Sequence, residues 1–424
     1  MWPVQVYRAD FELTLPGPPS TLKLSTRFCY ACRVTLREGE PPLTSDPITE
    51  YVEAALPSYL ADLHEIVSID SGTMNKQGVD AVATEMERRL AALGCDITRI
   101  PNIMYGDSIV GRLRGTGEKK IVMVGHTDTV YPDGTAAQRP FHIDGDRAYG
   151  PGTSDMKNGI LAGLYAMKAL KDTERLPFGE LVFFLNSDEE VGSPTTAQAI
   201  DSECRNATAA LVLESGRAGN SVVVGRKGVY EYTLTVHGKN AHAGSNPERG
   251  RSAILELAHK IVGIAALNDL SPGTTVNVGI VHGGMRRNVV ASQAVCEIDV
   301  RTLTVAAQEE FDRALAQIIA EPFVPDTHTE VNIGHCFLPM ERNDRNQGLY
   351  EVARAVSARL GYELSSTDSG GGSDANHISG IGVPVLDGLG PRGGNAHSPE
   401  EHLQIPSVVE RTSLLAHLIL EIAK

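Results

Sequence analysis

The segment KIVMVGHTD at residues 120–128 decides how this chain folds. Its unbroken apolar run indicates a strand buried on both faces, as in a parallel sheet covered by helices, and polar residues follow at once. The pattern returns in ELVFFLNSDEE at residues 180–190 and in AALVLE at residues 209–214. Because open α/β sheets build their sites beyond the C-terminal ends of strands, these polar residues are the first functional candidates.

Helical periodicity alternates with these strands. Val82, Met86, Leu90 and Leu93 recur at helical spacing, and Gly94 is a typical C-terminal stop. We expect a largely parallel sheet covered on both faces. The expected helices cover residues 48–67, 79–93 and 157–171, with a short helix before residue 209, and the expected strands cover residues 109–113, 120–124, 181–185 and 209–213.

The pattern changes near residue 229. The segment YEYTLTV at residues 230–236 alternates like a half-exposed strand, and the expected order up to residue 333 is βαββαβ, which is typical of a small two-layer α+β domain. After Pro339 the alternation of helices and strands resumes. We therefore predict an α/β domain formed by residues 46–227 and 339–424, an inserted α+β domain at residues 228–338, and an N-terminal extension of unknown role at residues 1–45.

Composition narrows the choice of protein class. With 424 residues the chain exceeds one usual hydrophobic core, and its net charge of −15 argues against nucleic acid or an anionic membrane as partner. No apolar run approaches the roughly 20 residues needed to span a bilayer, and the N-terminus lacks the features of a secretory signal, so we expect a cytoplasmic protein. Six scattered cysteines predict no disulfide framework, and the pair Cys29 and Cys32 is interpreted as plain thiols rather than half a zinc knuckle or a redox pair.

The first polar segments are GHTD and GPGTSDMK. His126 and Asp128 point to the same side of an extended segment, so Asp128 can accept the second ring N–H of a metal-bound His126. The alternative is a histidine that merely caps a strand. Asp155 precedes a predicted helix and on its own is better explained as a helix cap.

Further candidates follow the later strands. Asp188, Glu189 and Glu190 are three adjacent acids that repel one another unless a cation neutralises them, although a solvated loop is the alternative. Glu214 follows the next strand, and His397 follows the short apolar strand VPVL. Together these segments deliver two histidines and several carboxylates, a set that suits zinc, with cobalt or manganese as substitutes.

In combination these motifs resemble the co-catalytic zinc exopeptidases, the family of glutamate carboxypeptidase, aminoacylase and succinyl-diaminopimelate desuccinylase. The resemblance covers about residues 46–424. The stretches HTDTVYPDGTAAQRPFHIDGDRAYGPGTSDMKNG, NAHAGSNPERG and GGGSDANHISGIGVPV are most similar to bacterial glutamate carboxypeptidase. The resemblance implies a catalytic domain in two parts, residues 46–227 and 339–424, and a lid and dimerisation domain at residues 228–338.

The resemblance also implies the roles of the site residues. Asp155 would bridge two Zn²⁺ ions per chain, Glu189 would be the general base, and Asp128 would support catalysis through His126. One ion would add His126 and Glu214, and the other would add Glu190 and His397. The implied ligand set is therefore His126, Asp155, Glu190, Glu214 and His397.

The inserted domain would supply the remaining groups. By the resemblance, His242 reaches the site of a neighbouring subunit in a homodimer and stabilises the oxyanion. Asn288, which lacks the proline usual after it, and Arg301 would hold the substrate carboxylate, since arginine binds carboxylates in bidentate fashion. A turn would complete that pocket with backbone N–H groups from Gly371, Gly372 and Ser373. Arg226, Lys227 and His377 are candidate contacts for an acidic side chain of the leaving amino acid, a choice that the sequence does not fix.

The expected activity follows from this resemblance. It implies a zinc-dependent metallocarboxypeptidase or amidohydrolase that cleaves an amide bond adjacent to a free carboxylate. It would release a C-terminal amino acid, with glutamate as a candidate, from a small N-acyl or peptidyl substrate. An aminoacylase, deacetylase or dipeptidase of the same fold is the alternative, and a non-catalytic metal-binding relative is a weaker one. A serine hydrolase lacks support because the chain has no G-x-S-x-G motif.

Overall fold

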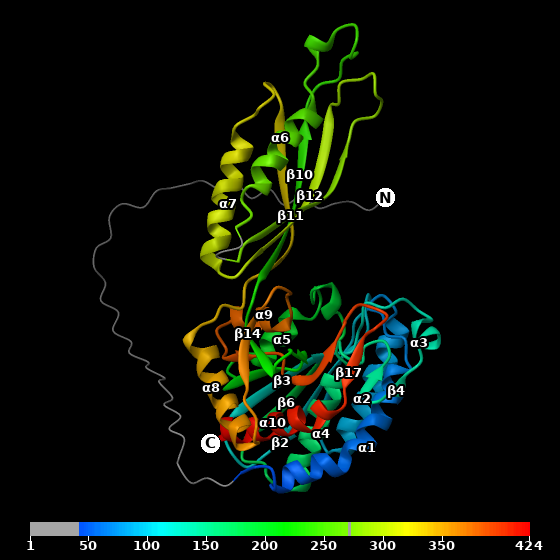
Figure 1. Cartoon of the computed structure of the whole chain (residues 1–424), viewed down its shortest axis with the longest axis vertical. Helices are drawn as coiled ribbons and strands as arrows, with labels where there is room; N and C mark the ends of the chain where they lie inside the picture. The colour runs from blue at the N-terminus through cyan, green and yellow to red at the C-terminus, as the bar shows by residue number, and fades with distance from the viewer. Residues whose placement is uncertain (1–41, 270–272) are drawn as a thin grey trace, which may run out of the picture. The chain divides into compact units, whose positions relative to one another are not determined.

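The computed structural model describes residues 42–269 and 273–424 (Figure 1). The predictions for Cys29 and Cys32, and for most of the N-terminal extension, lie outside these residues. Across the described ranges, no helix is long and apolar enough to cross a membrane.

The main sheet has six strands in the order β1-β2-β6-β3-β7-β15. Its centre is parallel, from β6 through β3 and β7 to β15, whereas β1 and β2 form an antiparallel edge. The expected parallel sheet is therefore confirmed at the centre, but the predicted strand at residues 109–113 runs against its neighbour. The strands are β1 (Asp96–Ile100), β2 (Ser108–Arg114), β3 (Lys120–His126), β6 (Glu180–Asn186), β7 (Ala209–Val212) and β15 (Val385–Leu386).

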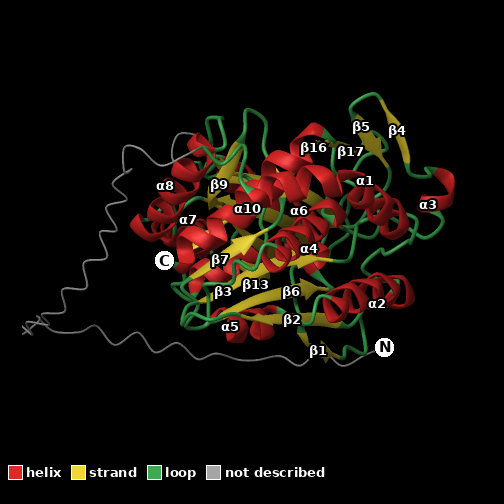
Figure 2. Ribbon diagram, turned by 90° about the horizontal axis from the view of Figure 1, so that it is seen from below, coloured by secondary structure: helices red, strands yellow, loops and turns green. Residues whose placement is uncertain are grey.

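Helices bury both faces of this sheet. Ile121 and Met123 of β3 pack into one apolar cluster, and the alternate residues Val122 and Val124 pack into another. Each buried side chain of this size contributes about 1.5–3 kcal/mol, which is why the run has no polar residue. Figure 2 shows α4 and α10 on one side of the sheet and α5 on the other. The first cluster includes α1 (Pro47–Val67), α2 (Lys76–Ala92), α4 (Lys157–Asp172), α8 (Asp344–Arg359) and α10 (Pro406–Ala423), and the second includes α5 (Ala197–Cys204) and α9 (Asp374–Gly380).

Two smaller sheets were not predicted. Their strands are short and partly polar, so they lack a readable period. One sheet pairs β9 with β14 in parallel, and the other has the order β4-β5-β17-β16-β8. The strands of these two sheets are β4 (His142–Asp144), β5 (Arg147–Tyr149), β8 (Ser215–Gly216), β9 (Ser221–Arg226), β14 (Ser365–Ser369), β16 (Gly390–Gly394) and β17 (His402–Gln404), and the short helix α3 (Thr135–Gln138) precedes β4.

A four-stranded antiparallel sheet in the order β11-β12-β10-β13 follows β9, and we call residues 228–337 the insertion. Its element order is βαββαβ, as the alternation predicted, and its core is a separate cluster that includes Tyr232, Leu234, Phe311 and Leu315. The elements are β10 (Gly228–His237), a short 3-10 helix (Pro247–Arg249), α6 (Ala253–Ala265), β11 (Thr275–Gly283), β12 (Gln293–Thr302), α7 (Val305–Ala320) and β13 (His328–Phe337).

Candidate metal centre

The candidate metal ligands come from strand ends and from the loops beside them. His126 is the last residue of β3, and it lies level with Asn186, the last residue of β6, in the parallel register. The chain therefore leaves both strands at one height. The other candidates are in a 3-10 helix after β6 (Glu189–Val191), directly after β7 (Glu214), before α4 (Asp155) and between β16 and β17 (His397).

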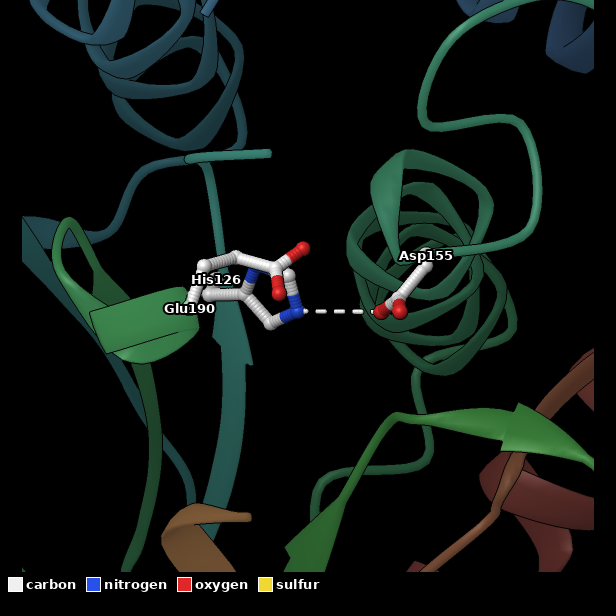
Figure 3. Close-up of side chains that lie close together, drawn as sticks. All are labelled: His126, Asp155 and Glu190. Atoms are coloured by element: carbon white, nitrogen blue, oxygen red, sulfur yellow. Dashed lines mark hydrogen bonds and ion pairs between the residues drawn. The ribbon is translucent and has the colours of Figure 1, made fainter. Parts of the chain in front are cut away.

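The carboxylate of Asp155 lies between two imidazoles. Its Oδ1 is 3.2 Å from Nε2 of His126, the contact drawn in Figure 3, and its Oδ2 is 3.0 Å from Nε2 of His397. Nε2 of His126 is also 3.6 Å from Glu214, and Nε2 of His397 is 3.4 Å from Glu190. All five predicted ligands thus meet around one carboxylate.

The same region contains the predicted general base. An oxygen of Glu189 lies 3.9 Å from Nε2 of His126. Two triplets of donor atoms, each within 4.8 Å of one another, could hold a cation: His126 with Asp155 and Glu190, and His126 with Glu189 and Glu214. By position alone, Glu189 could be a ligand as well as a base, so its separate role stays a prediction.

Burial raises the pKa values of the three glutamates in the cluster, and a bound cation would offset this effect. It raises the pKa of Glu189 well above the usual value, and it raises the pKa of Glu190 to about 7. Glu214 also has a raised pKa, through burial and the charge of Asp155. Oε1 of Glu190 is buried without a hydrogen-bond partner among the described residues. The donor set and this orphaned oxygen fit a bound metal, which would neutralise the clustered charge.

The pKa values of the two histidines are raised as well, which for a histidine favours the charged form. Burial lowers the pKa of His126, but hydrogen bonds to Asp128, Asp155 and Glu214 outweigh it and raise the pKa well above the usual value. Hydrogen bonds to Asp155 and Glu190 raise the pKa of His397 to about 10. Without a cation the cluster therefore retains protons, which a metal ion would displace.

Asp128 orients residues of the cluster through hydrogen bonds. Nδ1 of His126 donates to the Asp128 backbone carbonyl at 3.0 Å and lies 3.4 Å from its carboxylate, which leaves Nε2 facing the cluster. The Asp128 carboxylate also accepts the backbone N–H groups of Glu189 (3.3 Å) and Glu190 (3.2 Å) and the hydroxyl of Thr73 (2.8 Å). One buried acid therefore orients a ligand and the segment that carries the two glutamates.

Asp188 has a different role from its two neighbours. Its carboxylate accepts the backbone N–H of Thr195 at 2.9 Å and the hydroxyls of Thr195 and Thr196. Of the three adjacent acids in the sequence, Asp188 therefore anchors the following loop, and only Glu189 and Glu190 face the cluster.

Sequence reasoning missed Glu401. This buried carboxylate accepts the backbone N–H groups of Gly152 (2.9 Å), Ser154 (2.8 Å) and Asp155 (2.9 Å), together with the hydroxyl of Tyr131 (2.6 Å). It fixes the turn that presents Asp155. The only sequence signal is its place four residues after His397, in a PEEH run that is typical of a solvated loop.

A cavity of about 470 Å³ adjoins the cluster and includes Glu189, Glu214 and Arg226 in its lining. Arg226 is almost fully buried; its Nε donates to Asp387 at 2.5 Å, and its Nη1 donates to the carbonyls of Gly371 (3.0 Å) and Gly372 (3.1 Å). Its Nη2 has no hydrogen-bond partner among the described residues. Arg226 therefore places a buried cation beside the cavity, where it favours an anionic ligand.

The other predicted pocket residues are placed differently. Gly371 and Gly372 line the cavity, but both direct carbonyl oxygens to Arg226. Ser373 begins α9 and donates its hydroxyl to Asp387 at 2.8 Å. The side chain of Lys227 lies 3.4 Å from Thr275, and burial lowers the pKa of His377.

The predicted groups of the insertion lie apart from the metal ligands in their hydrogen bonds. His242 is exposed, and its Nδ1 accepts the backbone N–H groups of Gly244 and Ser245, each at 3.1 Å. Asn288 is exposed, whereas Arg301 donates to Asp299 at 2.9 Å and to the Gly370 carbonyl at 3.0 Å. Within residues 42–269 and 273–424, the cavity lining includes none of His242, Asn288 and Arg301.

Two histidines and four carboxylates, gathered from strand ends and the loops beside them, are typical of hydrolases that hold metal ions at the edge of a sheet. Residues 122–421 match the model of Peptidase family M20/M25/M40, and the chain belongs to this family. The match confirms the resemblance seen in the motifs. The chain is therefore a hydrolase of a family of metallopeptidases and amidohydrolases.

Known relatives cover most of the chain. Carboxypeptidase G2 from Pseudomonas sp. (strain RS-16) is 30% identical over 374 residues, which cover 86% of this chain and 89% of that protein. A succinyl-diaminopimelate desuccinylase from Cupriavidus taiwanensis is 26% identical, with 82% and 94% covered. Among solved structures, aminopeptidase PepT from Bacillus cereus is similar with a TM-score of 0.75 at 25% identity, covering 87% of this chain and 99% of that one.

Proposed function

We propose that this protein is a zinc-dependent amide hydrolase that releases a C-terminal amino acid, with glutamate as the candidate, from a small N-acyl or peptidyl substrate. The observation that carries the proposal is the pairing of the histidine and carboxylate cluster with the cavity of Arg226. The cluster supplies the metal ligands that hydrolysis needs. The unpaired Arg226 N–H would bind the carboxylate of the leaving amino acid.

Two Zn²⁺ ions would be held by the five predicted ligands, with Asp155 shared because its two oxygens face different histidines. Co²⁺ or Mn²⁺ are suitable substitutes for a donor set of this kind. When bound, such a metal pair polarises the amide carbonyl and lowers the pKa of a shared water.

Glu189 would take the proton of the attacking water and pass it to the leaving amine. A general base must have a higher pKa than a free carboxylate to accept a proton readily, and burial raises the pKa of Glu189 above its usual value. Asp128 holds the Glu189 backbone N–H and the His126 ring, so it acts by positioning both.

The free carboxylate of the substrate would enter the cavity beside Arg226. The planar guanidinium is already fixed by Asp387, Gly371 and Gly372, so little side-chain entropy is lost when its free N–H binds. Asn288, Arg301 and Ser373 belong to the same proposal by resemblance, as does a homodimer in which His242 of one subunit stabilises the oxyanion in the other.

The test combines metal analysis with a substrate panel of N-acyl-glutamates, folate-type conjugates, N-acetyl amino acids and dipeptides. We expect close to two zinc ions per chain and turnover of N-acyl-glutamates that a strong chelator abolishes. Zinc-loaded protein that cleaves none of the amides, or turnover that survives the chelator, would contradict the proposal.

A second candidate is removal of an acyl group from a different amine, since desuccinylases are among the relatives. The same panel separates the two. An enzyme selected for the leaving amino acid keeps its preference for glutamate across acyl groups, whereas a deacylase or aminoacylase keeps its preference for one acyl group across amino acids.

A further inference from the structure

A second cavity of about 470 Å³ lies on another side of Glu190 and shares that residue with the Arg226 cavity. Its walls are the loop around Met74, the segment after β3 that includes Val130 and Tyr131, and Val191 beside Glu190. The two cavities therefore meet at a candidate metal ligand, as two halves of one substrate site would.

Three apolar side chains are open to solvent in this second cavity. Met74 is 74% exposed, Val130 is 42% exposed and Val191 is 41% exposed. Exposed apolar side chains gathered in a hollow next to a reactive site lose unfavourable contact with water when an apolar group covers them. The Arg226 cavity differs, because its lining includes a buried cation and no comparable cluster of exposed apolar residues among those described.

The walls of the second cavity are tied to the metal centre. Thr73 donates its hydroxyl to Asp128 at 2.8 Å, and Tyr131 donates its hydroxyl to Glu401 at 2.6 Å. A Cβ on Gly72 would lie 2.3 Å from the Tyr131 carbonyl oxygen, so only glycine allows the two walls to approach so closely. The hollow is therefore pre-formed by the same contacts that position the ligands.

Charge adds a selection rule. The described lining of the second cavity includes Asp133 and Glu190 but no lysine, arginine or histidine. With Glu190 engaged as a metal ligand, Asp133 remains to face an occupant, and its Oδ1 accepts a hydrogen bond from Asn75 at 2.6 Å. A ligand carboxylate in this hollow would meet the like charge of Asp133, and the described lining has no basic side chain to pair with it.

We propose that the second cavity binds the acyl part of the substrate and selects an uncharged apolar acyl group over one that ends in a carboxylate. The inference rests on the proposed function and names the substrate class of the same site. It assigns Met74, Val130 and Val191 as the residues that determine acyl specificity.

The test uses two acyl groups of nearly equal size on one leaving amino acid. N-isocaproyl-glutamate has an isopropyl group where N-succinyl-glutamate has its carboxylate. We expect the zinc-loaded protein to have the higher kcat/KM for the isocaproyl substrate. The variant Met74→Lys should reduce that preference about tenfold, which is the range that single pocket contacts provide.

The matched control is Met104→Lys, an equally polar change at another exposed methionine (61% exposed) that does not line this cavity. It should leave the ratio of the two kcat/KM values unchanged. Equal kcat/KM for the two substrates, or the same ratio in Met74→Lys as in Met104→Lys, would overturn the inference while leaving the proposed hydrolysis intact.

Calorimetry provides a readout that does not depend on turnover. In the zinc-loaded Glu189→Gln variant, the isocaproyl substrate should bind more tightly than the succinyl one, and adding Met74→Lys should narrow the difference. Absence of hydrolysis in the parent protein together with this binding pattern would sink the proposed function alone. Equal binding of the two ligands would sink the acyl cavity.

Discussion

The metal centre and the loops of the insertion contain residues that the same sequence motifs single out, yet the structure treats them differently. At the metal centre His126 is 1% exposed and lies near candidate partners from three other chain segments, at Asp155, Glu189 and Glu214. In the insertion His242 is exposed, and its hydrogen bonds are to N–H groups two and three residues away.

The difference shows what a parallel sheet does for chemistry. Strands that end at one edge gather side chains from distant segments at no further conformational cost, because the hydrogen bonds of the sheet already fix their ends. A loop of a separate two-layer unit has no such edge. His242 therefore needs closure of the insertion or a second subunit before it can act, which is the basis of the dimer proposal.

The largest expected effect is at the metal centre. Glu189→Gln removes the proton acceptor but keeps the size of the side chain, so kcat should fall about a thousandfold. Zinc content should stay at the parental level by metal analysis. Glu190→Gln is the contrasting variant, because it should lower zinc content. Parental turnover by Glu189→Gln would assign the base to another group.

The next effect tests whether the insertion acts across subunits. His242→Ala should lower kcat about a hundredfold if this histidine stabilises an oxyanion. Mixing His242→Ala with Glu189→Gln after subunit exchange should restore activity, because one site of a hybrid dimer then has both groups intact. If the mixture stays as inactive as its parts although hybrids form, His242 does not act in the partner's site.

The third prediction concerns Glu401, which holds the turn that carries Asp155. Glu401→Gln replaces an acceptor of three backbone N–H groups near Asp155, so zinc affinity measured by chelator competition should fall about tenfold to a hundredfold. Glu400→Gln, at the exposed neighbour, is the control and should retain parental affinity. A loss of thermal stability with unchanged zinc affinity would make Glu401 a structural residue only.

The last prediction concerns stability and a buried histidine of α10, His417. Burial lowers the pKa of His417 to about 4, although Asp46 lies 3.6 Å away and favours the charged form. Because the folded protein keeps this histidine neutral, its contribution to the free energy of unfolding is complete at pH values above the unfolded-state pKa of about 6.5. That contribution, about 3 kcal/mol for such a shift, is lost as the pH falls from about 6.5 through 4.

Urea unfolding in the presence of a chelator measures the loss of stability at acidic pH without a contribution from metal release. The parent protein should lose more stability between pH 7 and pH 4 than His417→Gln does. Equal losses in the two proteins would show that other groups carry the acid sensitivity.

The sequence indicated which candidate metal ligands lie together, but not the residues that hold them in place. His126, Glu190 and Glu214 could be placed together because each follows an apolar strand, and strand ends meet at one edge. The contacts of Glu401 and the burial of Arg226 depend on segments more than a hundred residues away, which no local pattern encodes. Asp188 and Glu189 are adjacent acids after the same strand, so only the family resemblance, and no local pattern, gives them different roles.

The fold was also predicted in part. Apolar runs identified the strands at the centre of the main sheet, and the change to strict alternation identified the insertion. The antiparallel edge was missed because an apolar run does not specify direction. The short link between Ile100 and Ser108 forces β1 and β2 to run in opposite directions, since parallel neighbours need a longer crossover.

The insertion leaves and rejoins the chain at one point. The backbone N–H of Arg226 donates to the Met340 carbonyl at 2.9 Å, and Val229 pairs with Phe337 where β10 and β13 run side by side. During synthesis the segment between them can therefore complete its own sheet while the main sheet still waits for β15 and α10. A gene that replaces this segment with a short turn should still encode a chain able to assemble the main sheet.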